Sequence, residues 1–310
     1  MKTLARIVLP AALSVSNAFA GEGGVTGYMQ GTYNDFLAGV FGPAGFYVRN
    51  DVAFYEATAG IRPLGGRVVA ESEQKIWLDV AKVVWLTDAK ILGARYGAAA
   101  TIPVIMEGDV TGGLTIGPFQ AFLSGEVHGV GDIYLNPIIL NWTFENHHFS
   151  LAPAVTVPTG GYDVDRLLNP GRNYWSADIA GSYTWYNPAS GAEISVTAGA
   201  MFNWKNPDTD YKTGNELHVD WLVGQHLSDN FAIAAVGYFS HQIEADNGSV
   251  AGPLNPGDFK GQGVGIGPAI MINLPFLGTN VSLIGKALYD VSSRDRFNGD
   301  IVMVSAAFKF

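Results

Sequence analysis

Polar and apolar side chains alternate along most of this chain, and that alternation limits the folds it can adopt. In residues 192–204, Ile194, Val196 and Phe202 share one face, whereas Glu193 and Ser195 share the other. A period of two residues indicates β-strands with two chemically different faces. Twelve stretches of this kind can be counted, centred near Val52, Val80, Ala98, Asn136, Ala152, Ala180, Val196, Val219, Ala235, Ile266, Leu283 and Val304.

Composition separates a membrane barrel from a soluble β-sandwich. Apolar residues make up 48% of the chain and charged residues only 15%, against about 25% charged in ordinary soluble domains. Yet the chain after residue 20 has no uncharged apolar run of about 18 residues, which a transmembrane helix would need. A closed barrel can also cross a membrane with all its backbone groups hydrogen-bonded. We therefore predict an all-β fold, a transmembrane antiparallel up-and-down β-barrel of about 12 strands.

The beginning of the chain reads as a secretory signal. Lys2 and Arg6 provide positive charge, residues 7–15 are apolar, and Ala18-Phe19-Ala20 resembles a cleavage site before Gly21. The expected organisation is a signal peptide at 1–20, an N-terminal segment at 21–45 and a barrel at 46–310.

The segment at 21–45 does not alternate like a membrane strand, although it carries Tyr33, Phe36, Leu37 and Phe41 among glycines. Two interpretations remain open: a short plug docked inside the barrel, or a tail in the periplasm. We favour the plug because docking would bury the apolar side chains.

Connections between the expected strands alternate between short and long, as in outer-membrane barrels. Ile61–Ser72 and Glu107–His128 are among the expected long outer loops. Lys82 interrupts the pattern because it shares a face with Leu78 and Val80, which we expect to meet lipid. Either a β-bulge or a register error of one residue would explain that interruption.

The last strand carries a specific signal. Phe308 and Phe310 end an alternating stretch that contains Ser305 and Lys309. A terminal aromatic on an amphipathic strand resembles the signal that the barrel assembly machinery reads. The prediction is therefore a location in the Gram-negative outer membrane, with membrane lipid, lipopolysaccharide and the assembly machinery as partners.

The second half of the chain carries a series of short motifs in a fixed order. They are Gly131-Asp132 with Pro137 and Trp142, Pro158–Asp163, Asn173–Trp175, Asp208–Gly214, His218 with Asp220, Gly237-Tyr238, Gln242 and Gly267-Pro268. On these motifs the chain resembles a known family, the outer-membrane transporters associated with the meta-cleavage pathway of phenol degradation. The resemblance covers about residues 130–310 and implies a barrel that admits aromatic or other apolar compounds. It supplies no catalytic residue.

Charged residues on the polar faces of the strands are expected to line the lumen and to carry an acidic excess. That lining would suit neutral or cationic solutes better than anions. The candidates are Arg49, Asp51, Arg95, Asp132, Asp178, Glu193, Glu216, His218, Asp220 and Lys286.

Other functions find less support in the residues. Glu216, His218 and Asp220 could form a general acid–base group of a hydrolase, but no Gly-x-Ser-x-Gly nucleophile motif accompanies them. We expect neither a metal site nor another cofactor. Nucleic acid is excluded as a partner because 16 basic residues face 28 acidic ones after residue 20. The main hypothesis is a passive channel for small organic solutes, and the alternative is an adhesin-like or structural surface barrel.

The assembly signal leads to a direct test. Deleting Phe310 should lower the amount of assembled barrel because the assembly machinery would read the last strand less well. Heat-modifiable gel migration of the membrane fraction measures the folded form. An unchanged yield of folded protein would contradict this role for Phe310.

Overall fold

The computed structural model describes residues 21–22, 27–64, 67–116, 119–248, 260–276 and 279–309. In these ranges the regular structure is β-strand, and no helix is long and apolar enough to cross a membrane. The strands are β1 (Gly45–Leu64), β2 (Arg67–Ile91), β3 (Ala94–Ile116), β4 (Phe119–Val130), β5 (Ile133–Phe144), β6 (His147–Val157), β7 (Ser176–Asn187), β8 (Ala192–Asn203), β9 (Glu216–Ser228), β10 (Phe231–Gln242), β11 (Gln262–Phe276), β12 (Thr279–Arg294) and β13 (Asn298–Lys309).

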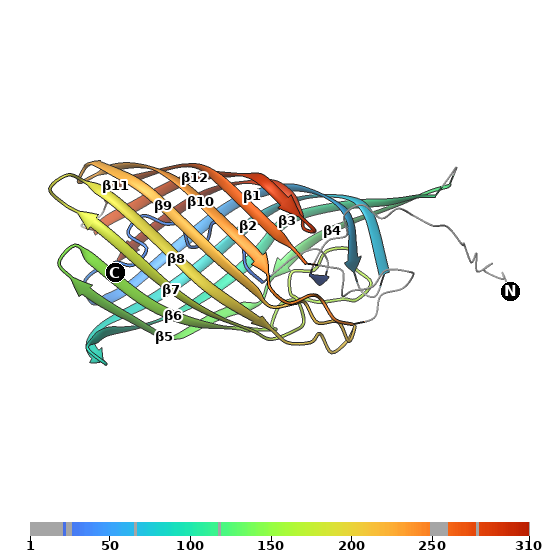
Figure 1. The fold of residues 1–310 in the computed structure, drawn as a ribbon, viewed down its shortest axis with the longest axis horizontal. Coiled ribbons are helices and arrows are strands. Elements are labelled where there is room, and N and C mark those ends of the chain that lie inside the picture. The colour runs from blue at the N-terminus through green and yellow to red at the C-terminus, as the bar shows by residue number, and fades with distance from the viewer. Residues whose placement is uncertain are drawn as a thin grey trace.

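These strands close into an antiparallel barrel (Figure 1). Consecutive strands pair from β5 to β13, and β13 returns to β1 in a register that runs from Tyr47↔Lys309 to Thr58↔Asn298. On the other side β1 pairs with β2, and β2 with β3. The predicted fold class is confirmed, and each of the twelve expected strand centres lies within a strand of the barrel.

The β3 strand explains how 13 strands make a 12-strand barrel. Its first part, Arg95–Thr101, pairs with β5, whereas its later part, Val104–Ile116, pairs with β4. Strands β4 and β5 therefore occupy one position in succession, with a break at Gly131-Asp132. At this break the Gly131 amide donates to the Pro103 carbonyl of β3, at 2.8 Å.

The two ends of the barrel differ. The end that holds the C-terminus has short turns, such as Leu92-Gly93 and Glu145-Asn146, and we take it as the periplasmic end. The opposite, outer end carries the longer loops 158–175 and 204–215, together with residues 243–248 that follow β10. In Figure 1 the β3–β4 hairpin projects beyond the rest of the barrel at that end.

Two expected outer loops are wrong. Much of 61–72 and of 107–128 is strand, because the β1–β2 and β3–β4 hairpins continue past the apolar belt. In these extensions Glu73 and Asp109 face outward and are exposed, while Ile76 and Val110 are buried inside. Strands that leave the membrane exchange a lipid neighbour for water, so the polar face turns outward and the expected alternation inverts.

The largest buried apolar cluster lies inside the barrel. It joins residues of β8 to β13 and Ala53 of β1 to Tyr28 and Phe36 of the N-terminal segment. The lipid-facing side holds exposed apolar residues such as Val223, Val302 and Val304. The barrel thus buries apolar surface on both sides of its wall, but only the inner side is packed against protein.

This difference predicts unequal effects for one substitution on the two faces of β12. Leu288→Ala should lower the free energy of unfolding by about 2–5 kcal/mol, because the buried side chain leaves a cavity. Leu283→Ala, on the outward face of the same strand, is the matched control and should cost less, since lipid fills the space. Urea unfolding in lipid vesicles measures both. Equal losses would contradict the packing described for the lumen.

Candidate functional site: the barrel lumen

Residues 27–44 of the N-terminal segment run through the lumen from the outer end to the periplasmic end (Figure 1). The contacts follow that path in order. Near the outer end the Tyr28 amide donates to Glu216 Oε1 at 3.0 Å. Further in, the Leu37 amide donates to Glu193 Oε1 at 2.6 Å. Near the periplasmic end Arg95 Nη1 donates to the Gly42 carbonyl at 2.9 Å.

His218 of β9 lies at the centre of a buried polar cluster. Its Nε2 is 3.0 Å from Asp178 Oδ1 of β7, and its ring stacks on Tyr28 and Tyr33, at 4.5 and 5.2 Å between centroids. Each tyrosine also donates to a wall carboxylate, Tyr28 to Asp220 at 2.7 Å and Tyr33 to Asp178 at 2.9 Å. The segment therefore covers the histidine and donates a hydrogen bond to each of the two carboxylates.

Gly199 makes room for that histidine. A Cβ atom at this position would lie 2.2 Å from His218 Nε2 and 2.9 Å from Asp178 Oδ1. Only glycine fits there without moving the imidazole, so this lumen-side glycine of β8 serves the packing of the cluster.

Asp35 of the segment links two cations of the wall. Arg49 Nη1 of β1 donates to Asp35 Oδ2 at 2.6 Å, and Lys286 Nζ of β12 donates to Asp35 Oδ1 at 2.9 Å. Arg49 also pairs with Asp51 at 2.7 Å. Because Lys286 is buried, the Asp35 carboxylate compensates a charge that water does not reach. Sequence reasoning missed Asp35, since a lone aspartate among glycines has no periodic signal.

The segment does not fill the lumen. It leaves a cavity of about 690 Å³ that extends along β1 to β3, β5 and β6. Leu167 and Pro170 of an outer loop line one end of the cavity, and Phe41, Tyr47 and Leu86 line the other end. The cavity therefore spans most of the distance between the two ends of the barrel.

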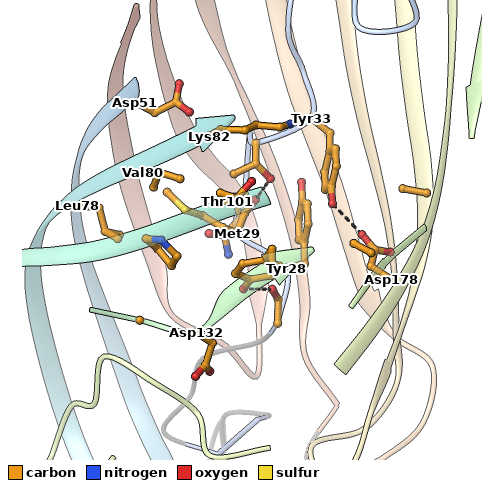
Figure 2. Close-up of a pocket in the computed structure, with 18 of the residues that line it drawn as sticks. Tyr28, Met29, Tyr33, Asp51, Leu78, Val80, Lys82, Thr101, Asp132 and Asp178 are labelled. Carbon is orange, nitrogen blue, oxygen red and sulfur yellow. Dashed lines mark hydrogen bonds between the residues drawn. The ribbon is translucent and has the colours of Figure 1, made fainter. Parts of the chain in front are cut away.

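The inner face of β2 forms an apolar wall of this cavity (Figure 2). Leu78, Val80 and Val84 point inward there together with Lys82, while the neighbours Trp77, Val83 and Trp85 are exposed on the lipid side. Of the two explanations for Lys82, the register error of one residue is confirmed: Leu78 and Val80 face the lumen together with this lysine and do not meet lipid. The structure has no bulge at Lys82; β2 is apolar on both faces, and this lysine marks the lumen side.

The ten charged lumen candidates fall into two groups. Arg49, Asp51, Asp132 and Asp178 border the cavity. The other six lie inside the barrel but do not border the cavity. Five of them form hydrogen bonds with the N-terminal segment, and the sixth, His218, stacks against its tyrosines. These six are Arg95, Glu193, Glu216, His218, Asp220 and Lys286.

Phe308 and Phe310 were singled out as the assembly signal. Phe308 belongs to β13 and pairs in register with Val48 and Val281. Phe310 lies outside the described residues.

The buried cluster has limited chemical options. In the described ranges no group of three or more His, Asp or Glu side chains is arranged to hold a metal ion. His218 is fully buried. An acid–base group of that kind has no exposed face on which a peptide or lipid ester could sit.

Comparisons with known proteins agree with the barrel. A family model described as "Putative MetA-pathway of phenol degradation" matches residues 61–306, which extends the resemblance toward the N-terminus. No curated protein sequence matches the chain.

Among solved structures, an outer-membrane channel from Pseudomonas putida F1 is similar with a TM-score of 0.67 and 14% identity, over 90% of this chain and 98% of that one. The translocator domain of the autotransporter NalP from Neisseria meningitidis has a TM-score of 0.45 and 12% identity, over 87% and 90% of the two chains. A FadL homologue from Pseudomonas aeruginosa has a TM-score of 0.39 and 10% identity, over 95% and 97%.

The ion pairs of Asp35 can be tested by substitution. Asp35→Asn should weaken docking of the segment by about 3 kcal/mol, because Lys286 loses its carboxylate partner inside the barrel. Single-channel recordings in planar bilayers should then show a higher mean conductance. Asp109→Asn removes the same charge at an exposed position on the outward face of β3 and is the matched control. Equal conductance in both variants would contradict a holding role for Asp35.

Proposed function

Because this chain belongs to the phenol-degradation family whose model spans residues 61–306, we propose that it is an outer-membrane channel for small organic, chiefly apolar or aromatic, compounds. The observation that carries the proposal is the cavity between the N-terminal segment and the wall of β1 to β3. Its size, about 690 Å³, falls in the range of about 300–1,000 Å³ that small organic ligands occupy.

The lining of the cavity favours apolar solutes. Leu78, Val80 and Ile105 offer aliphatic surface to the cavity. Met29 of the segment lies near Leu78 and Val80 in Figure 2. A solute that enters gains burial of its apolar area, about 25 cal/mol per Å². A hydrophilic solute would instead lose water and find few partners on this wall.

Polar side chains border the cavity as well. Asp51, Lys82 and Thr101 lie along one side, and Asp132 lies near the outer end (Figure 2). Polar groups beside the apolar wall of β2 suit compounds that have an apolar body and a polar substituent, such as a phenol hydroxyl. The aromatic part of the proposal rests on the family.

The expected cation preference needs revision. Glu216 and Asp220 accept hydrogen bonds from Tyr28 of the segment, so they do not meet a passing solute while the segment is docked. We propose that residues 21–45 act as a plug that excludes ions and water and leaves the apolar path beside it.

Two other functions have weaker support. A surface or structural barrel would need no apolar path between its ends, and the cavity favours transport over it. A hydrolase built on His218 lacks access, because Tyr28 and Tyr33 stack on its ring. We assign the protein no catalytic role.

The apolar path can be tested by filling it. Val80→Trp should lower the uptake rate of a radiolabelled phenol several-fold, because the indole would occupy the cavity beside Leu78 and Thr101. Val83→Trp is the matched control: it makes the same change three positions away on the lipid-facing side, where Trp85 already lies. Uptake by cells that express each variant at equal folded level is the measurement.

The two variants separate the alternatives. Reduced uptake with Val80→Trp alone supports passage through the cavity. Equal uptake by both variants and by cells without the protein would overturn the channel and leave the surface-barrel alternative.

A further inference from the structure

One buried carboxylate at the outer end of the barrel is surrounded by donors. Asp246, in the stretch 243–248 that follows β10, has only 3% of its surface exposed. Its Oδ1 accepts from the Gly214 amide at 2.8 Å and from the Gln242 side-chain amide. Its Oδ2 accepts from the Tyr211 hydroxyl at 2.6 Å and from the Gly21 nitrogen at 2.6 Å.

The four donors are neutral groups as long as the Gly21 nitrogen is an amide, and an ionised Asp246 would then lack a counter-ion. Among the described residues no lysine, arginine or histidine nitrogen pairs with Asp246; the nearby Lys212 pairs with Glu244 instead. Burial raises the pKa of the Asp246 carboxyl group, although the hydrogen bonds of Tyr211 and Gly214 oppose the rise. A buried carboxylate of this kind calls for a cation.

The sequence supplies the cation. The signal expected at residues 1–20 ends with Ala18-Phe19-Ala20, so signal peptidase would cut directly before Gly21. Hydrolysis adds water across the Ala20–Gly21 bond: Ala20 leaves with the carboxylate, and Gly21 keeps the nitrogen. An α-amino group has a pKa of about 7.7–8.0 and takes up a proton at neutral pH.

We propose that Asp246 is a binding site for the processed amino terminus of this chain, with the Gly21 α-ammonium as its ligand. In the precursor the same nitrogen is an amide, which donates a hydrogen bond but carries no charge. The ion pair thus forms only after the signal peptide is removed. It attaches the start of the N-terminal segment to the outer loops, while β1 holds the other end of the segment near the periplasm.

The next residue supports the same placement. The Glu22 amide donates to Thr213 Oγ1 at 3.2 Å, and Glu22 Oε2 accepts from Asn206 Nδ2 at 2.8 Å. Thr213 and Asn206 are both fully buried. Gly21 and Glu22 therefore lie in a polar site between loop 204–215 and residues 243–248.

Protection of the amino terminus from chemical labelling tests the proposal without reference to any solute. Residues 21–49 contain no lysine and end at Arg49, so the tryptic peptide from the mature terminus carries the α-amine as its sole amine. Purified barrel in detergent is treated at neutral pH with an amine-reactive ester, and mass spectrometry follows that peptide. The expected rate in the folded wild type is at least tenfold below that of the heat-unfolded protein.

Three variants complete the test. Asp246→Asn should bring the rate close to that of the unfolded protein, whereas Glu244→Gln, on the same loop but half-exposed, should leave the terminus protected. A serine inserted between Ala20 and Gly21 moves the amine by one residue and leaves Asp246 intact. It should also label fast, with normal heat-modifiable migration as evidence of folding.

Two results would overturn the inference. One is a mature chain whose first residue is not Gly21. The other is a folded wild type that labels as fast as the serine insertion. Either result would leave the proposed solute path untouched, since that path depends on the cavity beside β2.

Discussion

Closure of the sheet between β1 and β13 is the constraint on which the rest of the structure depends. Lipid offers no partner to a backbone amide or carbonyl, so a sheet in the membrane must have no free edge. Twelve residue pairs from Tyr47↔Lys309 to Thr58↔Asn298 remove that edge. Closure also encloses a lumen, and whatever the inner faces of the strands carry must then find partners inside it.

The N-terminal segment provides partners for the polar side chains that closure places inside the lumen. The inner faces of β7, β8, β9 and β12 carry Asp178, Glu193, Glu216 and Lys286, all buried. Main-chain amides, tyrosine hydroxyls and Asp35 of the segment supply partners for them. The wall from β1 to β3 is more apolar on its inner side, so it has fewer polar groups that need a partner from the segment. The segment consequently packs toward β8 to β13, and the free space stays beside β2.

This asymmetry links the fold to the proposed function. A lumen that is polar all round would hold water or be filled by the segment, whereas an apolar wall leaves space that water wets poorly. The polar side holds the plug and the apolar side provides the path. Attachment of Gly21 to Asp246 would fix the outer end of the segment, so the division between the two sides would be established only in the processed protein.

Local pattern determined the barrel, its strand positions and the acidic residues of the lumen. Period-two alternation in residues such as 192–204 depends on neighbours two apart and on contrast between lipid and water, and both are readable from the chain. Three features needed the tertiary structure. Leu78 and Val80 face the lumen. Alternation could not show this, because both faces of β2 are apolar and a period of two residues does not distinguish the inside of a barrel from its outside. The β1–β2 and β3–β4 hairpins remain paired beyond the membrane, where their outward face meets water and is polar. Asp35, Tyr28 and Asp246 acquired partners 188 to 251 residues away, and contacts at such separations exist only once the barrel has closed around the segment.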